Sequence, residues 1–168
     1  MHIREIQEKD NHTIEQIIKR SLESFDLHIP GTAYFDPQLG ELAQFYKQQP
    51  NAKYWVLVNE KDTAVGGVGI APFGRDPHIC ELQKLYIAPE AQGLGLSREL
   101  MNTALEFAKK HYTYCYLETV KKLEVANLLY TKVGFRKLEK PLDGSEHGAM
   151  DAWYIKDFRG EAKHSGDE

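Results

Sequence analysis

The chain has 168 residues, the size of one domain, and carries a net charge of −4 at pH 7. Hydrophobic residues make up 42% of it and charged residues 27%, so it can bury a substantial core and intrinsic disorder is excluded as its main state. Because the balance is acidic and no long basic block occurs, a dedicated nucleic-acid binder is excluded as well.

The cysteines and the lack of long apolar runs indicate where in the cell the protein works. The two cysteines, Cys80 and Cys115, form no CxxC motif and no Cys/His ligand spacing, so we expect free thiols and no metal site. The first residues lack the apolar run of a signal peptide, and no stretch approaches the roughly 18 apolar residues of a membrane span. We therefore expect a cytoplasmic protein with no membrane partner.

The first fifty residues predict a short strand and two helices. Residues 2–6 alternate as a strand does, and Asp10 or Asn11 can cap the helix that follows. The apolar face of this helix repeats at helical spacing through Ile14, Ile17, Ile18 and Leu22. After an irregular loop over 24–34, Asp36 and Pro37 predict the cap and first turn of a second helix. Its apolar face would be Leu39, Leu42, Phe45 and Tyr46.

The pattern then changes from helical to extended. Residues 54–58 are rich in β-forming side chains. A turn at 60–62 would let this strand form a hairpin with residues 63–71. A second turn at 74–77 leads to a third strand over 79–87. These strands predict an antiparallel meander.

The rest of the chain alternates helices and strands. A helix over 95–111 separates the strand at 79–87 from one at 114–119, which predicts a βαβ unit and a locally parallel pair. The remaining elements are a helix over 123–133 ended by Gly134, and a final hairpin of 136–138 with 152–156. The fold class is therefore α/β, with one mixed sheet of α+β type and helices on both faces.

The most informative stretch is 81–97, where a strand stops at Pro89 and two glycines precede a helix. Gly93 and Gly95 let the backbone approach a ligand closely, and free N–H groups at the start of a helix attract negative charge. The sequence therefore predicts a pyrophosphate cradle.

Two nucleotide-binding loops compete for this stretch. The P-loop pattern G-x-x-x-x-G-K-S/T is absent. A dinucleotide-binding loop fits better, since Glu118 ends the next strand about 20 residues on, where a ribose-binding acid would stand. However, Arg98 occupies its third glycine position, and five residues separate Ile87 from Gly93, too many for the tight turn of that motif.

Three sequence blocks carry a family resemblance. Residues 92–97 resemble the Q/R-x-x-G-x-G/A loop with which GCN5-related N-acetyltransferases (GNAT) bind the pyrophosphate of acetyl-CoA. Residues 85–89 resemble the strand and proline before that loop, and 126–135 resemble the family block A-x-x-L-Y-x-x-x-G-F. Two positions depart from the pattern: Ser97 stands where glycine or alanine is usual, and Leu123 where asparagine is frequent.

The resemblance implies a fold, a reaction and a cosubstrate. The fold is an antiparallel meander plus a splayed parallel strand pair, in a single acyl-CoA N-acyltransferase domain over 1–157, followed by a polar, flexible tail over 158–168. The reaction is acetyl transfer from acetyl-CoA to a primary amine by direct attack in a ternary complex. The implied acetyl-CoA contacts are Leu85, Ile87, Gln92, Gly93, Leu94, Gly95, Leu96, Ser97, Arg98, Asn127 and Lys132.

The resemblance also assigns roles. Glu81 stands at the position of the general base, acting directly or through water, and burial at a strand would raise its pKa toward neutrality. Tyr130 stands at the position of the general acid that protonates the leaving thiolate. The N–H of Leu85 would polarise the acetyl carbonyl.

The acceptor would enter between two loops, 25–35 and 141–149. Their polar-aromatic candidates are His28, Tyr34, Phe35 and His147, and Asp26, Asp36 and Glu146 could attract a cationic amine. The sequence does not distinguish between a small molecule, a polyamine and a protein amino group as the acceptor. A non-catalytic acyl-CoA sensor on the same fold and an enzyme for longer acyl groups are the alternatives, and a homodimer through a free strand edge is compatible with either.

Overall fold

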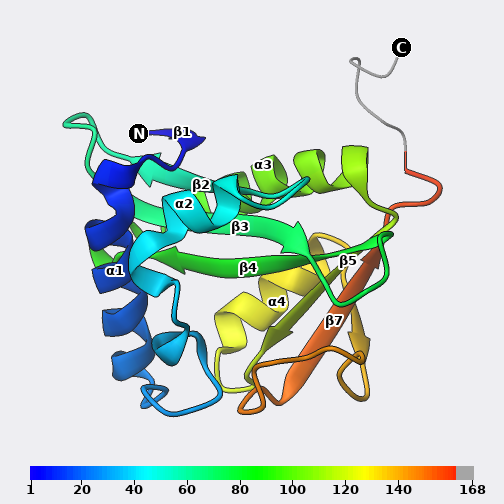
Figure 1. Cartoon of the computed structure of the whole chain (residues 1–168). Helices are drawn as coiled ribbons and strands as arrows, with labels where there is room; N and C mark the ends of the chain where they lie inside the picture. Colours follow the sequence, from blue (N-terminus) through cyan, green and yellow to red (C-terminus); the bar gives the residue numbers. More distant parts are fainter. Residues whose placement is uncertain (162–168) are drawn as a thin grey trace.

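A seven-stranded sheet runs through the middle of the molecule in the order β1-β2-β3-β4-β5-β7-β6 (Figure 1). The computed structural model describes residues 1–161. The strands are β1 His2–Glu5, β2 Lys53–Val58, β3 Ala64–Pro72, β4 Ile79–Ile87, β5 Tyr114–Thr119, β6 Arg136–Leu138 and β7 Ala152–Asp157. Neighbours pair antiparallel except β4 and β5, which are parallel. The predicted mixed sheet with an antiparallel meander is confirmed.

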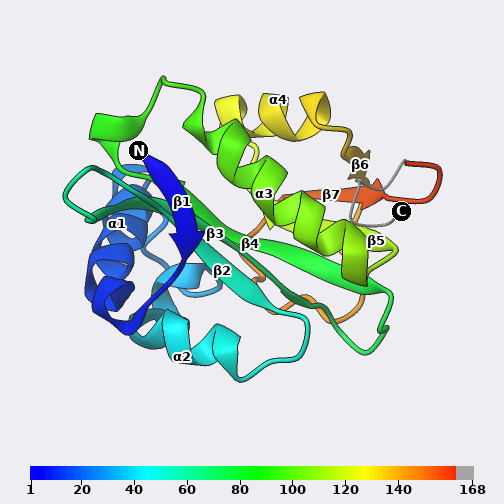
Figure 2. The ribbon, with the colours of Figure 1, turned by 90° about the horizontal axis from the view of Figure 1, so that it is seen from above.

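Two helices cover each face of this sheet (Figure 2). They are α1 Asn11–Ser24, α2 Leu42–Lys47, α3 Leu96–His111 and α4 Glu124–Lys132. One core cluster lies under α1 and α2, and a second lies under α3 and α4. Strand β3 is buried along almost its whole length because both of its faces are covered, which explains its nearly continuous run of small and apolar residues.

Strands β4 and β5 stay together only at their beginnings. Their register pairs Ile79 with Tyr114, Cys80 with Cys115 and Glu81 with Tyr116, and no pair follows. Beyond Glu81 the two strands diverge, as predicted for a splayed pair. The backbone edges that would have bonded to each other now face a gap in the sheet.

A β-bulge interrupts β4 at this gap. The register against β3 moves from Gly69–Gln83 to Gly67–Tyr86, so two residues of β4 oppose one of β3. Lys84 takes a left-handed φ of 52°, which costs a non-glycine residue about 1–2 kcal/mol. Its carbonyl accepts a 2.8 Å hydrogen bond from the Tyr54 hydroxyl, which holds the bulge in place.

Two glycines in β3 make room for the tyrosines behind the bulge. A Cβ on Gly67 would lie 2.4 Å from the Tyr54 ring, and one on Gly69 would lie 2.6 Å from the Tyr46 hydroxyl. Any larger residue would push these rings aside. The glycines are therefore packing requirements of the sheet and serve the site only indirectly.

Three local predictions need correction. Asp36 does not cap a helix: a 3₁₀ turn covers Leu39–Glu41 and α2 begins only at Leu42, because the Asp36 carboxylate binds other side chains. Asp10 precedes α1 but makes no side-chain cap, since its carboxylate binds Arg4 and the N–H of Gln7.

The third correction concerns the expected tail over 158–168. Phe158 is buried in the core under α3, and its N–H bonds to the carbonyl of Thr113 at 2.9 Å. Packed structure therefore continues at least to this residue. Positions 162–168 of the expected tail lie outside the described residues.

Candidate active site

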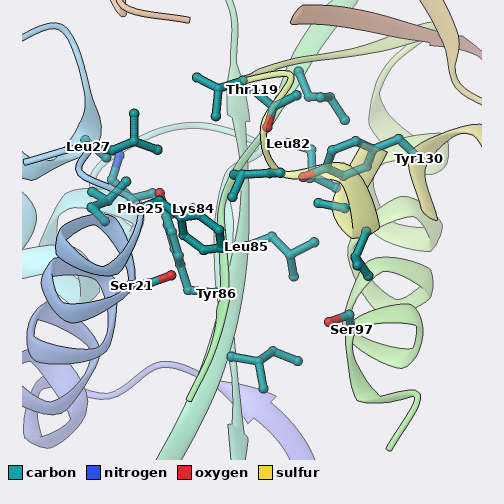
Figure 3. A pocket seen from close by; sticks show the side chains of 18 of the residues that line it. Ser21, Phe25, Leu27, Leu82, Lys84, Leu85, Tyr86, Ser97, Thr119 and Tyr130 are labelled. Carbon is teal, nitrogen blue, oxygen red and sulfur yellow. The ribbon is translucent and has the colours of Figure 1, made fainter. Parts of the chain in front are cut away.

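A cavity of about 700 Å³ opens where β4 and β5 diverge. Figure 3 shows its walls: α1 and the loop after it on one side, β4 in the middle, and α3 with Tyr130 on the other. The side chains of Leu82 and Leu85 and the hydroxyls of Ser97 and Tyr130 lie around the same space. One continuous cavity thus joins the glycine loop to Glu81.

The glycine loop forms one end of the cavity. Pro89 starts a 3₁₀ turn, and Gly93 and Gly95 then take left-handed φ angles of 80° and 74°, with Gly95 directly before the first residue of α3. A Cβ on either glycine would meet nothing within 4 Å, so backbone conformation alone requires glycine here. The free N–H groups of the 16-residue helix α3 face this end of the cavity.

Gln92 occupies one backbone group of Ile87, a residue predicted to contact acetyl-CoA. Its side-chain amide donates a 2.8 Å hydrogen bond to the carbonyl of Ile87, on the strand edge that faces the gap. That carbonyl is therefore already bonded, and a ligand lying along β4 would have to displace an exposed glutamine side chain to reach it.

Tyr130 lies on α4 across the gap from β4. Its ring is 7% exposed and packs against Phe135 and Tyr154, with centroids 6.1 and 5.6 Å apart. Its hydroxyl points into the cavity (Figure 3) and makes no hydrogen bond within the described part of the chain. Burial raises the pKa of this hydroxyl to about 12, so it stays protonated and can donate near neutral pH.

Glu81 stands at the point where the parallel pairing ends. A relay of hydrogen bonds orients it: the Tyr46 hydroxyl donates to Gln83 at 2.6 Å, and the Gln83 amide donates to Glu81 at 2.7 Å. Burial is the main reason why the pKa of Glu81 rises from 4.5 to about 7, and the charge of nearby Glu118 adds to the rise. A carboxylate with this pKa can take up a proton near neutrality.

A second polar cluster closes the acceptor side. Asp36 bonds to Lys84 at 2.9 Å and to His147 at 3.0 Å, which ties both loops to the bulge. Burial alone would raise the pKa of Asp36, but the bond from His147 and the charge of Lys84 outweigh it and lower that pKa. The Asp36 carboxylate raises the pKa of His147 in turn. The two loops also meet at Gly31, whose carbonyl accepts from the N–H of Ala149.

Ten of the predicted site residues line the cavity. They are Glu81, Leu85, Ile87, Gln92, Gly93, Gly95, Leu96, Ser97, Tyr130 and His147. The others lie elsewhere, each for a visible reason.

Leu94 is 63% exposed at the tip of the glycine loop. Arg98 and Lys132 line a separate hollow of about 620 Å³ between α3 and the end of α4. Asn127 uses its amide internally: its NH₂ donates to the carbonyls of Val120 and Leu123, and its oxygen accepts from Tyr154. Asn127 therefore braces the turn that leads into α4.

Three acceptor candidates do not line the cavity. The Tyr34 hydroxyl bonds to Glu23 at 2.6 Å, Phe35 is 58% exposed, and His28 packs beside Tyr34. By contrast, Lys84, Gln83 and Glu118 line the cavity. No sequence pattern predicted a role for Lys84 or Gln83, and the sequence indicated Glu118 only as the ribose-binding acid of the dinucleotide-binding loop. The parallel register was the missing signal, since it aligns Tyr116 with Glu81 and so puts Glu118 on the same face of the sheet.

The described residues contain neither a cluster for a metal ion nor a helix that could span a membrane. No group of three or more His, Cys, Asp or Glu side chains within 1–161 could hold a metal ion. No helix in that range is long and apolar enough to cross a bilayer.

Comparison with known proteins agrees with this geometry. The model of the acetyltransferase (GNAT) family matches residues 14–135. The chain belongs to this family. A similar curated relative is the Escherichia coli uncharacterized N-acetyltransferase YjgM, 39% identical over 142 residues, which cover 83% of this chain and 84% of the relative. Membership makes the chain an acyl-transferring enzyme, an N-acetyltransferase by family.

Solved structures share the fold at low identity. A GNAT acetyltransferase from Staphylococcus aureus superposes with a TM-score of 0.79 at 19% identity, over 94% of this chain and 99% of that one. The PaiA N-acetyltransferase of Thermoplasma acidophilum, solved with coenzyme A, superposes with a TM-score of 0.69 at 20% identity, over 93% and 98%. Both confirm the GNAT architecture of this chain.

Proposed function

We propose that the protein transfers the acetyl group of acetyl-CoA to a primary amine by direct attack in a ternary complex. The observation that carries the proposal is the single cavity that joins the glycine loop to Glu81 and has the Tyr130 hydroxyl along its wall. A cradle for phosphate, a proton acceptor and a proton donor then face one space, which is what amide formation from a thioester requires.

The donor end fits acetyl-CoA. The left-handed glycines and the start of α3 offer backbone N–H groups to a pyrophosphate, and a fold neighbour from Thermoplasma acidophilum was solved with coenzyme A. The unpaired edge of β4 offers the N–H groups of Leu85 and Ile87, of which the first would polarise the acetyl carbonyl. Leu94, Arg98 and Lys132 belong to this proposal as outer contacts. Bound acetyl-CoA supplies the thioester whose C–S bond is replaced by the C–N bond of the product.

Proton movement completes the reaction. An ammonium acceptor and acetyl-CoA give an amide, a free thiol and one proton. Of the two protons that the nitrogen loses, Glu81 takes one, directly or through water. Tyr130 gives its hydroxyl proton to the departing sulfur, and the second nitrogen proton restores the Tyr130 hydroxyl. The pKa of Glu81, about 7, suits the first task, and the raised pKa of Tyr130 keeps its hydroxyl protonated until the sulfur departs. The setting we propose is the cytoplasm, with a small-molecule, polyamine or protein amine as acceptor.

The test is release of free thiol from acetyl-CoA across a panel of primary amines, polyamines and peptides with free amino groups. Turnover with at least one amine, reduced about 100-fold or more in Glu81→Gln, is the expected result. Glu60→Gln, an exposed carboxylate in the β2–β3 turn, is the matched control. Tight coenzyme A binding without turnover on any amine would instead identify an acyl-CoA sensor, and faster turnover with longer acyl donors would identify another acyltransferase.

A further inference from the structure

Glu118 is a second carboxylate at the acceptor end of the cavity. It lies two residues after Tyr116, the register partner of Glu81, so Glu118 and Glu81 project from the same face of the sheet. Its Oε2 accepts a 2.7 Å hydrogen bond from the Tyr116 hydroxyl, which itself accepts from the N–H of Leu142 at 3.2 Å. The carboxylate is therefore held in one orientation by a strand and a loop.

The other oxygen of this carboxylate lacks a partner. Glu118 Oε1 is buried and, among residues 1–161, it is the one buried side-chain polar atom without a hydrogen bond. A buried carboxylate oxygen with no donor is costly, and a catalytic or ligand-binding role is one reason for a protein to keep such an atom. Glu118 lines the cavity, so an amine bound there lies beside its carboxylate.

The cationic side chains around the cavity are bonded elsewhere. Lys84 and His147 bond to Asp36, and the Lys122 ammonium donates to the carbonyl of Phe25. Glu118 and Glu81 thus form a negative region whose charge no lysine or histidine of the wall neutralises by a direct bond. An ammonium group supplies both the missing donor and the missing positive charge.

We propose that Glu118 is the acceptor-recognition residue of this enzyme and that it binds the amine as its ammonium ion through Oε1. The inference rests on the proposed function, because it takes the acceptor end of the cavity to receive an amine. The bound nitrogen then gives one proton to Glu81, directly or through water. The substrate class that follows is an amine with a free, protonated NH₃⁺ group, in preference to a neutral alcohol or amide nucleophile.

Direct binding tests this without a known acceptor. Isothermal titration of n-butylammonium chloride into the full chain would compare wild type, Glu118→Gln and the control Glu60→Gln, with 1-butanol as the uncharged probe. Glu118→Gln preserves the bond from Tyr116 but removes the charge, so n-butylammonium should bind about tenfold more weakly, with Glu60→Gln unchanged. Glu118→Asp, which restores the charge, should recover part of that loss. Equal affinity in wild type and Glu118→Gln, or no binding to wild type, would overturn the proposal.

Kinetics with the best amine of the panel separates this proposal from the proposed function. Glu118→Gln should raise the acceptor KM about tenfold and leave the acetyl-CoA KM unchanged. The acid limb of acceptor kcat/KM should also move to lower pH, because Glu81 loses a repelling neighbour; Lys84 and His147, which face it too, stay in place. If the wild type turns over and Glu118→Gln has the same kinetic constants, the role of Glu118 is wrong and the proposed reaction stands. Glu118-dependent binding without turnover on any amine would overturn the proposed reaction alone.

Discussion

The donor end and the acceptor end of the cavity are built in different ways. The donor end comes from one continuous stretch, the end of β4 and the loop into α3, and it acts through backbone groups whose positions two glycine φ angles set. The acceptor end gathers Glu81, Glu118, Lys84 and His147 from β4, β5 and the 139–151 loop, and side-chain hydrogen bonds hold them. A backbone site is local in sequence, whereas a side-chain site depends on how distant segments pack.

The largest expected effect is at Glu81, at the acceptor end. Its pKa is about 7 in the folded chain and 4.5 in an unfolded one, so the unfolded chain ionises first as the pH rises. The free energy of unfolding should therefore fall by about 2–3 kcal/mol between pH 5 and pH 8 through this residue. In Glu81→Gln this contribution should vanish, as urea denaturation at both pH values would measure. A pH dependence identical to that of wild type would contradict the buried state of Glu81.

The next effect is at Tyr130, where the two ends meet. Tyr130→Phe removes one hydroxyl and keeps the ring packing, so kcat should fall about 100-fold with little change in the acetyl-CoA KM. Tyr34→Phe is the control, since its hydroxyl bonds to Glu23 outside the cavity. Steady-state rates decide the matter: an unchanged kcat would remove Tyr130 from the mechanism.

A substitution at Asn127 tests whether this residue stabilises the turn before α4 or contacts acetyl-CoA. Asn127→Ala removes the side-chain bonds to the carbonyls of Val120 and Leu123, each of which keeps one backbone N–H donor, and leaves the Tyr154 hydroxyl without its partner. The loss of three hydrogen bonds should cost about 2 kcal/mol of stability and lower Tm by about 4–8 °C. Thermal unfolding followed by circular dichroism measures this. A normal Tm combined with a raised acetyl-CoA KM would return Asn127 to the donor site.

The smallest effect is expected at the glycine loop itself. Gly95→Ala places a Cβ on a residue with a φ of 74° in open space, so only backbone strain of about 1 kcal/mol is added. The loop should relax away from this conformation and raise the acetyl-CoA KM, while the acceptor KM stays constant. Gly148→Ala, at a glycine without that strain and with equal room, is the control. A raised acceptor KM in Gly95→Ala would show that the two ends are not separate.

The structure confirmed what depends on short-range patterns. Alternation predicted β1, β-forming side chains between turns predicted the meander of β2, β3 and β4, and helical spacing predicted α1. The positions of Pro89, Gly93 and Gly95 predicted the loop that opens α3. Predictions were wrong where a side chain could bond either to a neighbouring backbone group or to a residue distant in the sequence. Asp36 bonds to Lys84 and His147 and does not cap a helix, and the Asp10 carboxylate bonds to Arg4 and does not cap α1.

The fold class, the family and the glycine loop can be predicted from residues close together in the chain, because those residues carry the information in their propensities, periodicity and φ preferences. Which acidic and basic side chains share the cavity depends on the packing of distant segments. The bulge at Lys84, the end of pairing at Glu81 and the unpartnered oxygen of Glu118 arise from contacts between segments far apart in the chain. The residue types alone do not predict these contacts. The free energy of each contact between polar or charged groups depends on the burial and the neighbours that folding creates.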